Sequence, residues 1–258
     1  MTITHDDIRN YQPQSHCLKG KNILVTGAGD GIGRVAALTY ARHGATVLLL
    51  GKTTSKLECV YDEIEDFGGE QPAILPMNLE GASHAEMQQL AKLIGNEVAQ
   101  LHGILHNAGT LGALTPLEMY DVITFEQVMK VNFTAPFMLT QALFDLLKSA
   151  NHASVVFTTS SVGSVPRAFW GAYALSKQGV EGLSDIWTQE TKSTTKLRFN
   201  CLNPGATRTN MRAHAYPGEN PMTLKTPEEL MPAYVCLMSD DSIDVKGEVI
   251  DLQPKKVQ

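Results

Sequence analysis

Short runs of β-branched and leucine residues alternate along the chain with longer segments whose apolar residues recur at helical spacing. Such alternation predicts strands and helices in turn. The predicted strands are Asn22–Thr26, Thr46–Leu50, Ala73–Met77, Gly103–His106, Ser154–Thr159, Leu197–Leu202 and Glu248–Leu252. The predicted helices are Gly31–His43, Ser55–Phe67, Ser83–Gln100, Thr124–Ser149, Ala172–Thr191 and Pro227–Met238.

This order predicts an α/β fold, a doubly wound and mainly parallel sheet of seven strands with helices on both faces and right-handed crossovers. No repeat or Pro/Gly/Ser-rich linker divides the chain, so we expect one domain at 21–258 after an N-terminal extension at 1–20. That extension and Met211–Thr226 are the segments we expect to be loosest. Ligands of doubly wound sheets bind beyond the carboxyl ends of the strands, where strand order reverses. Each motif below follows a strand in this way.

Composition excludes several classes of function. Of the 258 residues, 43% are hydrophobic, which is enough for a large core. The net charge is −6 and no cationic run exceeds the pair Lys255-Lys256, which argues against a nucleic-acid partner. Histidine and cysteine show no grouping of zinc type, so no metal site is indicated.

The cysteines and the apolar runs bear on where the protein acts. The four cysteines are scattered without a CxxC pair, as expected of reduced thiols in the cytosol. The first twenty residues lack the apolar segment of a signal peptide. The longest aliphatic run, Val47–Leu50, is too short to span a bilayer. We therefore expect a cytoplasmic protein without a membrane partner.

The most informative pair of residues is Tyr173 and Lys177, which share one face of a predicted helix. A free phenol titrates near pH 10, but a cation within about 4–6 Å lowers that pKa by roughly 1–3 units. Such a tyrosine can give a proton to a carbonyl oxygen or take one from an alcohol. Alone, the spacing is equally compatible with a solvated surface pair.

A glycine-rich loop follows the first predicted strand and opens a helix, with the spacing Gly27-x3-Gly31-x-Gly33. Glycines allow a tight turn and bring backbone N–H groups to a pyrophosphate at the helix N-terminus. The loop does not fit GxGxxG, and it lacks the GK[ST] ending of a nucleotide triphosphatase. The alternative is a plain strand-to-helix turn.

The end of the second predicted strand indicates which dinucleotide is preferred. An acid there binds a ribose 2′-hydroxyl, whereas a base accepts a 2′-phosphate. This chain has Gly51-Lys52, with no acid. The sequence therefore predicts NADP(H) in preference to NAD(H), unless Lys52 only faces solvent.

Taken together, these motifs resemble the short-chain dehydrogenase/reductase family over residues 21–252, which implies a Rossmann-like dinucleotide-binding catalytic domain. The matching residues are Thr26-Gly27-x3-Gly31-Ile32-Gly33, Asn107-Ala108-Gly109, Asn132, Ser160, Tyr173-x3-Lys177 and Pro204-Gly205. The sequence is further similar to the YciK-type bacterial oxidoreductases of that family at three segments, His106–Gly109, Trp170–Tyr173 and Asn203–Thr209.

The resemblance implies a role for each catalytic residue. Tyr173 would be the general acid for reduction and the base for oxidation, and Lys177 would bind the nicotinamide ribose and lower the Tyr173 pKa. Ser160 would bind the substrate oxygen. Its neighbours Thr158, Thr159 and Ser161 also carry hydroxyls, so the choice of Ser160 rests on the family spacing. Alternation along the strand gives Thr159 and Ser161 the opposite direction. Asn132 would hold a water that links Lys177 to solvent.

The resemblance also implies the cofactor contacts. The loop Gly27, Asp30, Gly31, Ile32 and Gly33 would hold the pyrophosphate, while Asn78 and Leu79 would flank the adenine. The adenosine ribose would lie against Asn107, Ala108 and Gly109. The nicotinamide carboxamide would be held by Pro204, Gly205, Thr207 and Thr209.

Some positions depart from the family pattern. Asp30 stands where NADP-preferring members often carry a cation, which opposes the inference from Lys52. His106 replaces a frequent asparagine, and a structural role is favoured over an acid role for it. The end Asp251-Leu-Gln-Pro replaces Asp-Gly-Gly, which leaves the contacts at this edge undefined.

The resemblance implies a small carbonyl or alcohol compound as the substrate. We expect Met211–Thr226, Leu111–Leu114 and Phe169-Trp170 to line an apolar pocket, with Arg167 and Arg212 at the surface. Candidates are an acyl-carrier-protein-linked 3-oxoacyl reductase and a small-carbonyl reductase. Alternatives from other classes are a nicotinamide-dinucleotide-sensing regulator without chemistry and a nucleotide-dependent transferase.

By resemblance, the two long helices would pair across a dyad in a homodimer or homotetramer. The apolar residues Phe133, Phe137, Leu143 and Leu146 could equally belong to the core.

Overall fold

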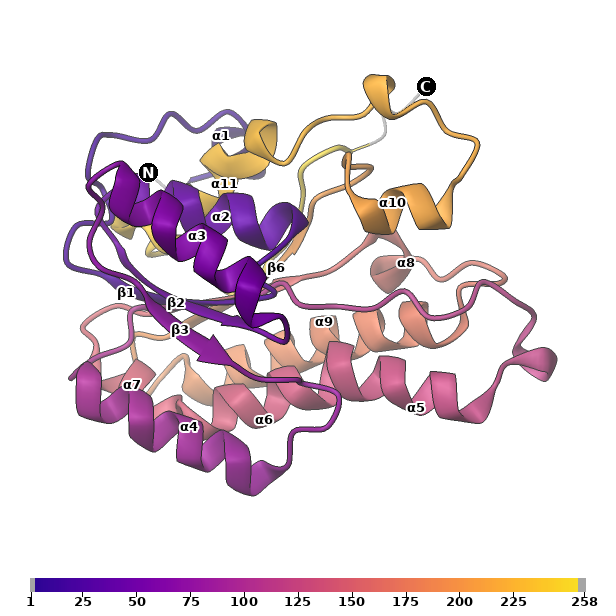
Figure 1. The fold of residues 1–258 in the computed structure, drawn as a ribbon, viewed down its shortest axis with the longest axis horizontal. Helices are drawn as coiled ribbons and strands as arrows, with labels where there is room; N and C mark the ends of the chain where they lie inside the picture. The colour runs from indigo at the N-terminus through magenta and orange to yellow at the C-terminus, as the bar shows by residue number, and fades with distance from the viewer. Residues whose placement is uncertain (1–2, 255–258) are drawn as a thin grey trace.

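The computed structural model describes residues 3–254 and shows the predicted architecture, with seven strands in one sheet (Figure 1). The strands are β1 (Asn22–Thr26), β2 (Thr46–Gly51), β3 (Ala73–Pro76), β4 (Gly103–His106), β5 (Ser154–Thr158), β6 (Arg198–Asn203) and β7 (Val249–Asp251). Their order is β3-β2-β1-β4-β5-β6-β7, and every neighbouring pair is parallel. Strand order therefore reverses between β1 and β4, where a doubly wound sheet opens a binding crevice.

Helices cover both faces of this sheet (Figure 1). The α-helices are α1 (His5–Arg9), α2 (Gly31–Arg42), α3 (Thr54–Asp66), α4 (His84–Glu97), α5 (Val122–Met129), α6 (Ala135–Ala142), α7 (Phe144–Ser149), α8 (Ser161–Ser164), α9 (Gly171–Thr191), α10 (Asn210–Ala215) and α11 (Met231–Met238). A π-helix, η2 (Lys130–Thr134), joins α5 to α6. Short 3₁₀ turns are η1 (Leu117–Met119), η3 (Pro221–Thr223), η4 (Glu228–Leu230) and η5 (Asp240–Ser242).

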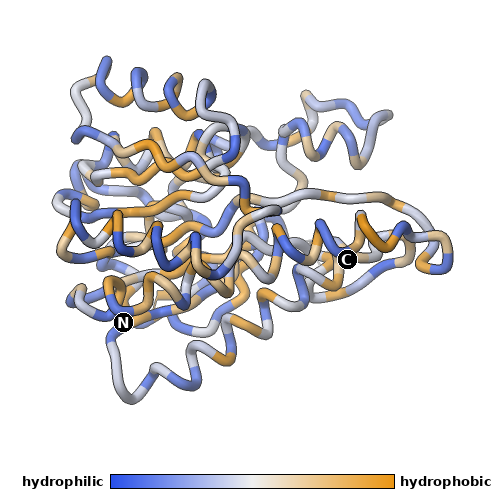
Figure 2. Tube along the Cα trace, turned by 60° about the horizontal axis from the view of Figure 1, so that its bottom comes forward, coloured by the Kyte–Doolittle hydropathy of each residue, from blue (hydrophilic) through white to orange (hydrophobic). Residues whose placement is uncertain are grey.

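The strands separate two apolar cores because successive side chains point to opposite faces of a sheet. In β1, Ile23 and Val25 pack with α2, α3 and α11, whereas Leu24 packs with α4 and α6 on the other face. All three residues are fully buried. Figure 2 shows hydrophobic colour concentrated along the strands and mixed colour along the covering helices. The two-sided burial explains why the strands read as continuous apolar runs.

The helix predicted at Thr124–Ser149 is divided into four pieces, and this boundary prediction was wrong. Pro136 lacks an N–H and its ring crowds the carbonyl four residues earlier, at Asn132. The backbone there widens into η2, and α6 begins at Ala135. A second break falls at Leu143, between α6 and α7. A π-helical turn of this kind is rare and is frequently found at functional sites.

The two segments expected to be loosest contain regular secondary structure within residues 3–254. Helix α1 begins with a reciprocal capping box between Thr4 and Asp7. Ile8 and Leu18 are fully buried in the core that α11 also joins. The segment Met211–Thr226 contains α10 and η3. The division of the chain into an extension at 1–20 and a domain at 21–258 stays a prediction.

Across residues 3–254, none of the helices combines the length and apolar character needed to cross a membrane. Cytoplasmic location stays a prediction from the sequence.

Candidate functional site

A cleft of about 530 Å³ lies at the carboxyl ends of the central strands. It collects residues that follow six of the strands, β1 to β6, and most of the predicted set is among them. The predicted residues that line it are Gly27, Asp30, Gly31, Ile32, Lys52, Asn78, Leu79, Asn107, Ala108, Gly109, Ser160, Tyr173, Lys177, Pro204, Gly205, Thr207 and Thr209. Two predicted residues, Gly33 and Asn132, lie behind this lining rather than in it.

The glycine loop brings α2 unusually close to the sheet. A Cβ at Gly33 would lie 2.3 Å from the Gly27 carbonyl oxygen and 2.6 Å from the Asn107 side-chain nitrogen. Gly27 adopts φ +69°, and a Cβ there would meet the Ala108 backbone at 3.0 Å. Only glycine fits both places. The close approach leaves the helix N-terminus facing the cleft, as a pyrophosphate site requires.

Thr26 fixes the two central strand ends to each other. Its hydroxyl accepts hydrogen bonds from the backbone N–H groups of Asn107 and Ala108, both at 3.0 Å. The side chain is 1% exposed. These bonds satisfy partly buried backbone donors at the point where strand order reverses, so the turn after β4 is held against the turn after β1.

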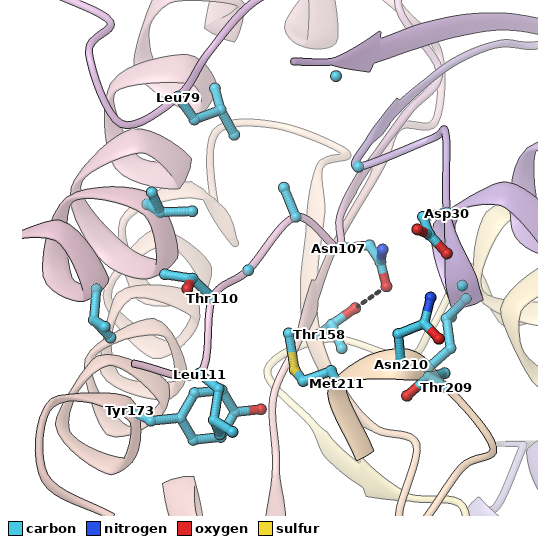
Figure 3. A pocket seen from close by; sticks show the side chains of 18 of the residues that line it. Asp30, Leu79, Asn107, Thr110, Leu111, Thr158, Tyr173, Thr209, Asn210 and Met211 are labelled. Atoms are coloured by element: carbon cyan, nitrogen blue, oxygen red, sulfur yellow. Dashed lines mark hydrogen bonds between the residues drawn. The ribbon is translucent and has the colours of Figure 1, made fainter. Parts of the chain in front are cut away.

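The predicted catalytic residues meet at the other end of the cleft. Tyr173 and Lys177 lie on α9, and Ser160 caps α8 directly after β5. The Lys177 ammonium nitrogen donates a 2.7 Å hydrogen bond to the Thr158 carbonyl and lies 5.5 Å from the centre of the Tyr173 ring. In Figure 3 the Tyr173 hydroxyl points into the cleft.

The pKa of Tyr173 does not follow the expected direction. Burial raises it to about 12, and a hydrogen bond with Ser160 opposes this rise. The reason is geometric, since Lys177 directs its charge at the Thr158 carbonyl rather than at the phenol oxygen. Burial also lowers the pKa of Lys177 to about 8. In this structure, Lys177 therefore does not lower the pKa of Tyr173.

Ser160 lines the cleft together with Thr158 and Thr159, and the hydroxyls of those two residues bond Asn107 and Glu181. The Thr159 hydroxyl points to the other side and donates a 2.6 Å bond to Glu181. The Ser161 hydroxyl accepts a bond from Arg167 at 2.9 Å. The hydroxyls of Thr159 and Ser161 are thus hydrogen-bonded to other side chains, in agreement with the alternation argument.

Asn132 is buried in η2 and serves the backbone of another segment. Its side-chain oxygen accepts from the Thr110 N–H at 2.8 Å, and its nitrogen donates to the Thr110 carbonyl at 2.9 Å and to the Ser176 hydroxyl at 3.1 Å. It therefore fixes the loop that carries Gly109 against α9. Its role in holding a water stays a prediction.

Two lysines lie at the adenosine end of the cleft. Lys52 is exposed and lines the cleft after β2, as predicted. Lys56, which the sequence analysis missed, lines it one turn later on α3 and forms an ion pair with Asp30. Lys56 lowers the pKa of the Asp30 carboxyl. The acid that opposed the NADP(H) prediction is thus partly neutralised by a neighbouring cation.

His106 has the structural role that was favoured for it. Its ring is stacked on Phe157 with centroids 4.9 Å apart, and Nε2 lies 2.8 Å from the Thr140 hydroxyl. Full burial lowers its pKa to about 3, so it is neutral and cannot act as an acid at neutral pH.

The loop after β6 is held by Gln253, a residue with no recognisable motif signal. Its side-chain nitrogen donates to the carbonyls of Pro204 at 2.8 Å and Ala206 at 3.0 Å. Thr209 caps α10 by accepting from the Arg212 N–H at 3.2 Å. The end Asp251-Leu-Gln-Pro, which differs from the family's Asp-Gly-Gly, therefore places Gln253 where it holds the loop that was expected to bind the carboxamide.

The wall beside Tyr173 is largely apolar. Leu111 lies next to the Tyr173 ring and Met211 lies across the cleft from it (Figure 3). Trp170 completes this wall, with its ring 5.8 Å from that of Tyr173. Arg212 also lines the cleft, contrary to the expected surface position. Arg167 is exposed, as expected, and lies over Trp170.

Within residues 3–254, no group of three or more His, Cys, Asp or Glu side chains is arranged to hold a metal ion.

Comparison with known proteins identifies the family to which this architecture corresponds. The family model described as short chain dehydrogenase matches residues 21–220. Over 245 residues, the chain is 48% identical to YciK of Escherichia coli K12, an uncharacterized oxidoreductase, with 95% of this chain and 96% of YciK covered.

Solved structures agree with this result. A short chain dehydrogenase from Salmonella enterica serovar Typhi superimposes with a TM-score of 0.93 at 49% identity, covering 95% of this chain and all of the other. A structure from Escherichia coli CFT073, described as a short chain dehydrogenase complexed with NADPH, gives a TM-score of 0.91 at 48% identity. It covers 94% of this chain and 100% of that one.

The close packing of α2 predicts that Gly33→Ala is destabilising. The added methyl must displace backbone at Gly27, and overpacking of this kind costs about 1–3 kcal/mol. Gly182→Ala is the matched control, since that helical glycine has open space around its Cβ position. There, alanine is expected to raise the free energy of unfolding by up to about 1 kcal/mol. Urea denaturation measures both, and equal effects of the two substitutions would refute the packing argument.

Proposed function

Because the chain belongs to the short-chain dehydrogenase family, we propose that it transfers hydride between a nicotinamide dinucleotide, preferably NADP(H), and the carbon of a ketone or secondary alcohol. The observation that carries this proposal is the shape of the cleft. One end of the cleft is formed by the glycine loop and the N-terminus of α2, and the other end contains Ser160, Tyr173 and Lys177. A dinucleotide laid along the cleft fits both ends.

The bound dinucleotide supplies the redox chemistry, and the protein orients the reactants and manages one proton. The Ser160 and Tyr173 hydroxyls would bind the substrate oxygen from two directions. Tyr173 would then give its proton to that oxygen during reduction, or accept one from the alcohol during oxidation. In the free protein, Lys177 is held by Thr158 and does not lower the pKa of Tyr173, so we infer that its charge favours the phenolate only when the dinucleotide is bound.

The preference for NADP(H) rests on charge at the adenosine end. Lys52 and Lys56 both line the cleft, and because Asp30 pairs with Lys56 the three side chains together carry a net positive charge. A 2′-phosphate adds negative charge and strong acceptor oxygens, which lysine ammonium groups bind well. The NADPH complex of the Escherichia coli CFT073 relative supports the same preference.

Tyr173→Phe is expected to bind NADPH normally and to lose turnover by about 10²-fold or more, because a general acid contributes roughly 10²–10⁴-fold. Lys177→Met is expected to weaken both turnover and NADPH binding. Tyr61→Phe is the control, since Tyr61 lies on α3 and bonds Glu65 and Gln71. NADPH oxidation with ketones, aldehydes and acyl thioesters, together with NADPH titration, gives both readouts. Near-normal turnover of Tyr173→Phe would show that the assignment is wrong.

Lys52→Ala is expected to weaken NADPH binding about tenfold, which corresponds to about 1.4 kcal/mol, and to leave NADH binding unchanged. Lys56→Ala should weaken NADPH binding further, because it also leaves Asp30 without its partner. Asp30→Asn in the Lys56→Ala background should recover part of that loss. Lys148→Ala, on exposed α7 surface, is the control. Calorimetric dissociation constants decide, and tighter binding of NADH than NADPH by the wild type would overturn the preference.

We also infer a homodimer or homotetramer. Apolar side chains stay exposed on the two longest helical segments, with Phe137 at 36%, Leu175 at 43% and Ile186 at 55% exposure. Leu143, by contrast, is fully buried core. Light scattering after size exclusion should give the mass of two or four chains. The substitution Ile186→Glu should lower that mass. A monomeric wild type would contradict the inference.

A further inference from the structure

One basic side chain reaches the substrate end of the cleft from α10. Arg212 lines the cleft together with Met211, and it is the cationic residue there that an acidic substrate would meet first. Lys177, the other cation at this end, is 4% exposed and donates its hydrogen bond to the Thr158 carbonyl beneath the site. Whether this end accepts a negatively charged substrate therefore depends on Arg212.

Arg212 is held in a two-pronged ion pair. Its Nε and Nη2 atoms each donate a 2.6 Å hydrogen bond to the two carboxylate oxygens of Glu219. The side chains of the pair are only 24% and 28% exposed. Bidentate pairing uses the donor fork in the geometry that a substrate carboxylate or phosphate would need. Glu219, which does not itself line the cleft, therefore takes up the two donors with which Arg212 would bind an anionic ligand.

Aromatic packing fixes the same guanidinium from another side. The Tyr216 ring lies 3.8 Å from the Arg212 guanidinium carbon, and it also packs 6.1 Å from the Trp170 ring. Trp170 in turn lies beside Tyr173. The cation is thus built into an aromatic wall that continues to the reacting hydroxyl. Releasing Arg212 toward a ligand would break the ion pair and this stacking together.

We propose that the carbonyl substrate is uncharged and apolar, and that Glu219 is the residue that excludes anionic substrates by neutralising Arg212. This inference rests on the proposed oxidoreductase function. Leu111, Met211 and Trp170 bury apolar carbon next to the carbonyl. A carboxylate in the same place would lose its water beside a guanidinium whose charge Glu219 already balances and whose Nε–Nη2 donor pair is already occupied, which is costly.

Two pairs of ketones with the same skeleton test this proposal. 2-Heptanone is compared with 6-oxoheptanoate, and 4-methylcyclohexanone with 4-oxocyclohexanecarboxylate, so that a methyl replaces a carboxylate. With NADPH and the wild-type protein, kcat/KM is expected to be at least about tenfold higher for the uncharged member. The difference should lie mainly in KM, because it arises from binding.

Glu219→Gln keeps the size of the side chain and removes its charge. It is expected to lower the ratio of uncharged to charged kcat/KM about tenfold, by improving the anionic member. Adding Arg212→Gln should abolish that gain, since the gain requires the released guanidinium. Glu58→Gln, at an exposed position on α3, should leave the ratio unchanged. NADPH binding and thermal unfolding of each variant confirm that the fold is kept.

The possible outcomes distinguish a failure of this inference from a failure of the proposed oxidoreductase function. Equal or better turnover of the charged ketones by the wild type overturns the substrate class and leaves the oxidoreductase assignment standing. A ratio unmoved by Glu219→Gln overturns the role of Glu219. Inactivity toward both uncharged ketones also overturns the inference. Inactivity of the NADPH-bound protein with every ketone, aldehyde and acyl thioester counts against the proposed function itself.

Discussion

The hydrogen bond from the buried Lys177 ammonium to the Thr158 carbonyl is the contact on which the site depends. It joins α9, which carries Tyr173, to the end of β5, which is followed by Ser160. Burying a charge is expensive without such a partner. Burial lowers the pKa of Lys177 only to about 8, so the group is still mostly protonated at neutral pH. A fixed cation beneath a buried phenol is the arrangement that the proposed proton transfer requires.

The opposite end of the cleft is built by close packing rather than by charge. Gly33 lets α2 approach the sheet, and the Thr26 hydroxyl holds the turn after β4 in place. Because both sets of contacts lie at the carboxyl ends of parallel strands, the fold places them in one cleft. The proposed cradle for the cofactor and the proposed proton-transfer site are therefore linked through the sheet, and Asn132 adds a second link between the loop after β4 and α9.

Local signals in the sequence were enough to predict the sheet, its strand bounds to within about two residues, and most of the cleft lining. They failed where the structure depends on contacts between distant residues. The π-helix at Asn132 depends on Pro136 and on the hydrogen bonds that the Asn132 side chain makes with the Thr110 backbone. Lys56 and Gln253 belong to no motif and enter the site only through the fold. The direction of the Tyr173 pKa depends on where Lys177 points, which i,i+4 spacing does not specify.

The central claim is that the Lys177 charge and a bound dinucleotide together make the Tyr173 hydroxyl labile near neutral pH. A nuclear magnetic resonance titration of ¹³Cζ-labelled tyrosine, with and without NADP⁺, measures this directly. We predict a Tyr173 pKa of about 12 in the free protein, a fall of roughly 1–3 units or more with NADP⁺ bound, and loss of that fall in Lys177→Met. A Tyr173 pKa that stays near 12 with NADP⁺ bound, or an equal fall in Lys177→Met, would contradict the account.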